Sequence, residues 1–157
     1  MLRTPIAILL SGLLAASPVW PQTLTPAAVA APGSALNDDS RAEAFYADIL
    51  TRFGDARPFS NIFQAKRQPE AMLINLQETY GIAVPKKGFA TGALEATAAP
   101  ETLPEGCMIG VEAEIANRDP YNRNLLPALA AYPDMTLVMQ HLRDPSKENH
   151  CLRFSAA

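Results

Sequence analysis

The sequence predicts an all-α protein of four helices, with a long connection between the second and the third. Apolar side chains recur at helical spacing in four segments, capping residues and glycines bound these segments, and no segment alternates with period two over a strand's length. The chain of 157 residues carries a net charge of −3. This mildly acidic balance, without a basic run, argues against nucleic acid or an anionic membrane as a partner.

The N-terminus has the pattern of a secretory signal sequence. Arg3 is followed by an apolar run over residues 6–16, which is shorter than the roughly 20 residues that a membrane-spanning helix needs. Residues 18–34 are uncharged and rich in Ala, Pro and Thr, a composition that indicates a tether without a core of its own. We therefore expect a signal sequence and spacer at 1–30, a linker at 31–37 and a helical domain at 38–157.

This organisation predicts a periplasmic or secreted protein with no membrane span once the signal is cleaved. The cleavage site stays open. Ala28-Val29-Ala30 fits the small-x-small rule but lies far from the apolar run, whereas cutting after Ser17 would leave Pro18 at the first mature position.

The first two helices are predicted from residues that can cap helix ends and from stripes of inward-facing positions. Ser40 and Glu43 have the spacing of a capping box, and Gly54 supplies the left-handed residue after the first helix. The second helix ends at Gly81 and carries a heptad stripe of inward positions, made up of Phe59, Ile62, Lys66, Pro69, Leu73, Leu76 and Tyr80. A lysine and a proline on this stripe are its most unusual feature.

Residues 86–102 form a connection rich in Gly, Ala, Thr and Pro, which is long enough to run the length of a bundle. Thr102 and Glu105 then predict a second capping box at the start of the third helix, and Pro120 and Pro127 should kink or split that helix. After a turn at 132–134, a fourth helix is predicted to extend as far as Phe154.

Several motifs resemble a family of bacterial ferritin-like proteins of unassigned function, over about residues 42–154. The resemblance rests on an Arg-Pro-Phe-x-Asn-Ile turn at 57–62, on Tyr-Gly-Ile-Ala-Val-Pro at 80–85, on Gly-Val-Glu-Ala-Glu-Ile at 110–115 and on Asn-His at 149–150. It implies a ferritin-like four-helix bundle. Such bundles hold two iron or manganese ions with one Glu from each of two helices and a Glu-x-x-His from each of the other two.

The chain departs from this ligand pattern. Lys66 and Pro69 occupy the positions of Glu and His on the second helix, and neither can ligate a metal there. Three donors implied by the resemblance remain in register, namely Glu43, Glu114 and His150. We therefore expect a vestigial metal site in which Lys66 snorkels to solvent or pairs with Glu43 or Glu114.

Each remaining donor also has a structural interpretation. Glu43 completes the first capping box, Glu112 and Glu114 leave open which of them faces inward, and His150 has the neighbours of a hydrogen-bonded core histidine. His141 is expected at the surface.

The two cysteines, Cys107 and Cys151, lie at ends of the third and fourth helices that meet in an antiparallel pair. Export favours their oxidation, and a bridge over this loop would stabilise the fold by about 4 kcal/mol in the chain-entropy model. Two buried free thiols are the alternative.

The sequence favours a non-catalytic structural or binding module of the bacterial envelope, without a cofactor. It identifies no partner, and it leaves open whether the protein forms a homodimer. The alternative is a divergent iron- or manganese-binding oxidoreductase that uses Glu43, Glu114 and His150 at a single metal.

Overall fold

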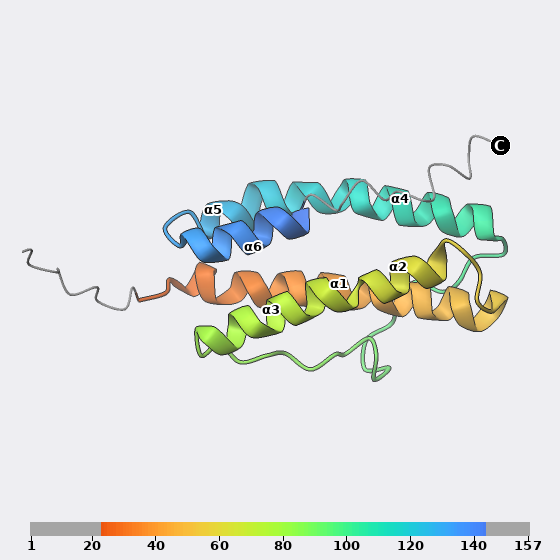
Figure 1. The fold of residues 1–157 in the computed structure, drawn as a ribbon, viewed down its shortest axis with the longest axis horizontal. Helices are drawn as coiled ribbons and strands as arrows, with labels where there is room; N and C mark the ends of the chain where they lie inside the picture. The colour runs from red at the N-terminus through yellow and green to blue at the C-terminus, as the bar shows by residue number, and fades with distance from the viewer. Residues whose placement is uncertain (1–22, 144–157) are drawn as a thin grey trace, which may run out of the picture.

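The computed structural model describes residues 23–143, and every regular element in this range is helical. The elements are α1 (Pro26–Phe53), α2 (Phe59–Ala65), α3 (Arg67–Thr79), α4 (Leu103–Pro120), the π-helical segment η1 (Tyr121–Leu125), α5 (Leu126–Ala128) and α6 (Pro133–Arg143). They make four lengths of helix, since α2 leads into α3 and α4 leads through η1 into α5 (Figure 1). The predicted all-α class is confirmed, and the arrangement is compatible with a four-helix bundle.

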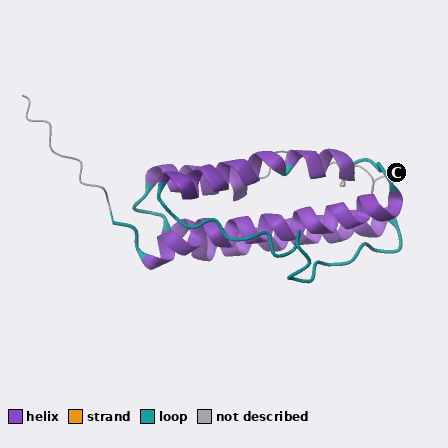
Figure 2. Cartoon of the chain, turned by 90° about the horizontal axis from the view of Figure 1, so that it is seen from below, coloured by secondary structure: helices purple, strands orange, loops and turns teal. Residues whose placement is uncertain are grey.

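The helices lie along a common direction. The α2–α3 length runs back beside α1, and residues 80–102 then return along the outside of the helices to the start of α4 (Figures 1 and 2). From there the α4–α5 length and α6 form a second antiparallel pair (Figure 1). Within residues 23–143, no helix combines the length and apolar character needed to cross a membrane.

Helix α1 begins much earlier than the sequence predicts. The side chain of Thr25 caps it by accepting the N–H of Ala28 at 3.1 Å, and Pro26 occupies the first turn, where proline is tolerated. The prediction of a linker at 31–37 and of a helical domain starting at 38 is therefore wrong. Small residues spaced three or four positions apart are buried along one side of this segment. Its composition alone had indicated a tether.

The predicted capping box at Ser40 and Glu43 is also wrong, because Ser40 lies in the middle of α1. Its side chain is buried, and its hydroxyl oxygen has no hydrogen-bond partner among the described residues. The glycine ends are as predicted: Gly54 and Gly81 have φ values of 74° and 64°, and the N–H of Gly54 donates to the Leu50 carbonyl at 2.9 Å.

The second predicted helix is divided between α2 and α3 at Lys66. The N–H of Lys66 still donates to the Ile62 carbonyl, and the N–H of Glu70 donates to the Lys66 carbonyl, at 3.1 and 3.2 Å. Pro69 has no N–H to offer the carbonyl of Ala65, and its ring crowds that carbonyl. The division is therefore a local break in an otherwise continuous path.

The predicted split of the third helix lies between its two prolines. The π-helical segment η1 separates Pro120 from Pro127. Each proline removes a helix donor, and the wider π turn accommodates the lost bonds. Thr102 caps α4 as predicted, with its hydroxyl accepting the N–H of Glu105 at 3.4 Å.

Two apolar clusters form the core. One gathers the N-terminal half of α1 with α3, η1 and α6, and includes Leu36, Leu73, Leu129 and Met135. The other gathers the C-terminal half of α1 with α2 and the start of α4, and includes Phe45, Ile49, Phe59 and Cys107. Along α1, the polar stretch 37–40 lies between the two clusters.

We expect Pro69→Ala to raise the free energy of unfolding by about 1–3 kcal/mol, because it restores a donor for the Ala65 carbonyl and removes the clash of the ring. Urea unfolding followed by circular dichroism measures this. Pro104→Ala is the matched control: Pro104 lies in the first turn of α4, so its replacement should change little. An equal gain at both positions would show that Pro69 does not strain the helix.

Candidate functional site

A layer of charged side chains separates the two apolar clusters. Asp39 comes from α1, Lys66 from the junction of α2 and α3, and Glu114 from α4. The ammonium nitrogen of Lys66 lies 3.0 Å from Oδ1 of Asp39, and the two side chains are 26% and 13% exposed. Three helical lengths thus contribute one charged group each to the same level.

The partner of Lys66 corrects our prediction. We expected Glu43 or Glu114 to pair with the ammonium, or Lys66 to reach solvent, but the paired carboxylate is Asp39. The reason is the early start of α1. With the predicted cap at Ser40, Asp39 would precede the first helix, whereas in the structure it lies within α1, one turn before Glu43.

Glu114 faces the layer and Glu112 faces solvent, which decides between the two glutamates. Burial raises the pKa of Glu114, and the positive charges of Lys66 and Arg118 offset this only in part. Burial likewise raises the pKa of Asp39, despite its hydrogen bond from Lys66. The layer therefore holds carboxylates whose charged forms are costly, with one ammonium compensating them.

Two buried tyrosines flank this layer. Tyr46 belongs to the cluster at the start of α4, and Tyr121 to the cluster around α6. Burial, followed by the negative charge of Glu114, raises the pKa of Tyr46 far above its ordinary value. Burial and the charges of Asp38 and Asp39 do the same for Tyr121. Both phenols therefore stay protonated at neutral pH.

The space for Tyr46 depends on Gly110 of α4. A Cβ atom at position 110 would lie 2.9 Å from the Tyr46 hydroxyl, too close for a relaxed contact. The glycine of the Gly-Val-Glu-Ala-Glu-Ile motif therefore lets α4 approach α1 one turn from Glu114.

A second charged cluster involves the long connection. Lys87 donates to Oε2 of Glu43 at 3.1 Å and also to Glu70 of α3. Partial burial by itself would lower the pKa of Lys87, but its hydrogen bonds to Glu70 and Glu43 outweigh this and raise it. Glu43, predicted as a metal ligand, thus serves to fasten the connection to α1 and α3.

The other predicted site residues are placed as follows. Pro69 is half-buried just after the junction of α2 and α3, and Cys107 is buried in α4 and is not a free thiol. Cys151 and His150 lie outside the described residues, so their pairing and ligand roles stay predictions. His141 is exposed.

Three residues of these charged clusters were missed from the sequence: Asp39, Glu70 and Lys87. Asp39 had a signal, since it precedes Glu43 by one helical turn. Glu70 and Lys87 had none, because their partners are brought to them by the fold of the connection.

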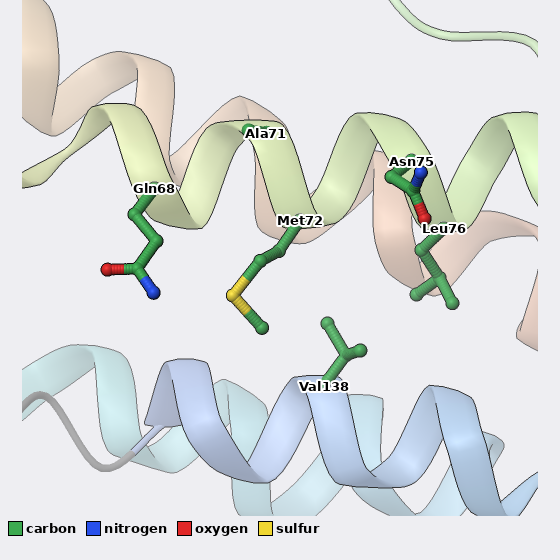
Figure 3. Close-up of a pocket in the computed structure, with 6 residues that line it drawn as sticks. All are labelled: Gln68, Ala71, Met72, Asn75, Leu76 and Val138. Atoms are coloured by element: carbon green, nitrogen blue, oxygen red, sulfur yellow. The ribbon is translucent and has the colours of Figure 1, made fainter.

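A groove lies between α3 and α6. Met72 and Leu76 of α3 face Val138 of α6, with Gln68 and Asn75 at the edges (Figure 3). Its volume is about 410 Å³. None of its lining residues is ionisable, so the groove adds no catalytic group to the layer.

Comparison with known proteins gives no assignment: no family model, no curated protein and no solved structure matches this chain.

We expect Lys66→Met to lower the free energy of unfolding by roughly 1–3 kcal/mol, because it leaves the carboxylate of Asp39 largely buried without its partner. Arg41→Met is the control. Arg41 pairs with Asp38 at 3.4 Å, but its side chain is 53% exposed, so its loss should be close to neutral. Denaturant unfolding at neutral pH compares the two, and equal effects would place Lys66 among ordinary surface charges.

The stability of Glu114→Gln relative to the parent should rise with pH. The folded parent binds the Glu114 proton more tightly than the unfolded chain does, because burial raises the pKa above its ordinary value of 4.5. As pH rises past that value, the parent loses stability that the Gln variant keeps. Urea unfolding at about pH 4 and about pH 7 measures the trend. The control Glu112→Gln, at an exposed position, should show no such trend. A fall in the relative stability of Glu114→Gln with rising pH would mean that the layer favours the charged form of Glu114.

Proposed function

We propose that this protein is an exported, ferritin-like helical bundle that has lost di-metal chemistry and acts as a structural or binding module in the periplasm or outside the cell. No residue of the site identifies the partner of such a module. The proposal has three supports: the signal-like N-terminus, the helical topology and the composition of the charged layer.

The topology supports the ferritin-like assignment. Two antiparallel pairs of helical lengths, α1 with α2–α3 and α4–α5 with α6, are joined by one long connection that returns along the helices (Figure 1). Ferritin-like bundles have one such long crossover, whereas simple up-and-down bundles have only short loops.

The observation that carries the loss of metal chemistry is the position of Lys66. Its ammonium lies against Asp39 and within electrostatic reach of Glu114, at the level between the two apolar clusters where a ferritin-like bundle would bind metal. An ammonium group has only donors, and it repels a divalent cation at short range. The residues present therefore do not fit an iron or manganese centre.

The charge balance explains how lysine side chains can take the place of metal ions in this layer. Four carboxylates, from Asp39, Glu43, Glu70 and Glu114, are accompanied by the ammonium groups of Lys66 and Lys87. Buried or half-buried carboxylates need a cation nearby, whether it is a metal or a side chain. Lysines on the second helical length and on the connection supply that charge from within the chain.

The alternative of a divergent metal oxidoreductase would need Glu43, Glu114 and His150 around one ion. In the structure Glu43 is bound by Lys87 on the connection. Among residues 23–143, no three His, Cys, Asp or Glu side chains are grouped so that they could hold a metal. No described contact favours this alternative, and metal binding tests it directly.

We expect the purified parent to retain less than a stoichiometric amount of manganese or iron through gel filtration, and the double variant Lys66→Glu with Pro69→His to bind manganese more tightly. The variant replaces the ammonium by a carboxylate and adds an imidazole one turn away, which rebuilds Glu-x-x-His opposite Asp39 and Glu114. Isothermal titration with Mn²⁺ gives the affinities.

Adding Glu114→Gln to the double variant should reverse the gain, because it removes a carboxylate that faces the layer. Adding Glu112→Gln should leave the gain intact, because Glu112 is exposed. Tight binding of two metal ions by the unmodified parent would contradict the proposal and support the oxidoreductase.

A further inference from the structure

The residues just before α1 are fastened to the turn between α5 and α6 by a buried tyrosine. The hydroxyl of Tyr132 accepts the backbone N–H of Thr25 and donates to the backbone carbonyl of Thr23, each at 3.0 Å. Tyr132 is only 3% exposed. Both hydrogen bonds of this buried hydroxyl therefore depend on residues that the composition assigns to a spacer.

The same segment supplies part of the core. Ala28, Ala31 and Ala35 are at most 2% exposed and belong to one apolar cluster with Leu73 and Met135. Their spacing of three and four residues keeps them on one side of α1. Removing the segment would therefore take away part of the apolar cluster that it shares with α3 and α6.

These contacts decide between the two positions at which a signal sequence could be cleaved. Cutting after Ala30 would delete Thr23, Thr25 and Ala28, leave the buried Tyr132 hydroxyl without either partner and remove the cap of α1. Cutting between the apolar run that ends at residue 16 and the start of the described fold at residue 23 would leave all of them in place.

We propose that the chain is processed within residues 17–23, and that Ala28-Val29-Ala30 survives in the mature protein as the first turns of α1. The reaction is hydrolysis of one peptide bond by a signal peptidase: water is the only co-reactant, the released signal peptide gains a carboxylate, and the mature chain gains a new α-amino group. The inference rests on the proposed export, and it assigns residues 23–37 to the folded domain.

The first test is the N-terminus of the exported protein. The full chain is produced in a bacterium, and the intact mass and N-terminal peptide of the extracytoplasmic protein are determined. We expect a mature chain that begins between residues 17 and 23. A mature chain that begins at Ala31 overturns this inference and leaves export standing, whereas a cytoplasmic chain that still begins at Met1 overturns the export on which it rests.

The second test is a pair of adjacent substitutions in the full chain. Ala28→Asp places a carboxylate where the side chain is 0% exposed, and it should lower the thermal midpoint of the exported protein by about 10 °C or more. Val29 is 41% exposed, so Val29→Asp should shift the midpoint by no more than about 2 °C. Equal midpoints for the parent and both variants would overturn the inference, because position 28 would then lie outside the folded core of the mature protein.

Tyr132→Phe provides a milder variant that keeps the ring and removes the hydroxyl. In a mature chain that retains residues 23–25, it should lower the midpoint by several degrees, because the N–H of Thr25 and the carbonyl of Thr23 lose their partner. An unchanged or higher midpoint would indicate that these residues are absent from the mature protein and would overturn the inference.

Discussion

The ion pair between Lys66 and Asp39 determines how the middle of this molecule can be built. It lies between two apolar clusters, where a carboxylate without a cation would be costly. Glu114 adds a second carboxylate from α4, and burial raises the pKa values of both acids. The helices can bring these acids together because one lysine accompanies them, and the phenols of Tyr46 and Tyr121 close the layer towards the apolar clusters on either side.

Internal cations also explain why the long connection follows the helices instead of leaving them. Lys87 holds Glu43 of α1 and Glu70 of α3, so residues 80–102 are fastened where they cross the second helical length. Without these ion pairs, a connection of this length would contribute mainly the entropic cost of closing a long loop. The long connection thus supplies positive charge to acids that a metal would neutralise in a metal-binding bundle of the ferritin-like kind proposed for this chain. The proposed loss of metal chemistry and the topology are therefore linked through one lysine.

The N-terminal half of α1 shows how composition can mislead. An uncharged stretch of Ala, Pro and Thr is typical of a tether, because such a segment has no large apolar side chains to bury. Here the small side chains are useful for the opposite reason: they let α3 pack close to α1, and Tyr132 binds the backbone before the first turn. The Thr25-Pro26 pair carried the helix-start signal, with Thr as cap and Pro in the first turn.

The sequence by itself determined the helical class, the glycine ends at Gly54 and Gly81, the cap at Thr102 and the split between Pro120 and Pro127, because each of these depends on residues within a few positions along the chain. It also placed Lys66 on an unusual inward stripe. Only the tertiary structure decided that Asp39 is the partner of Lys66 and that Lys87 binds Glu43. These pairs join residues far apart in the sequence, and their distances follow from how α1, α3 and the connection pack, which no local pattern encodes.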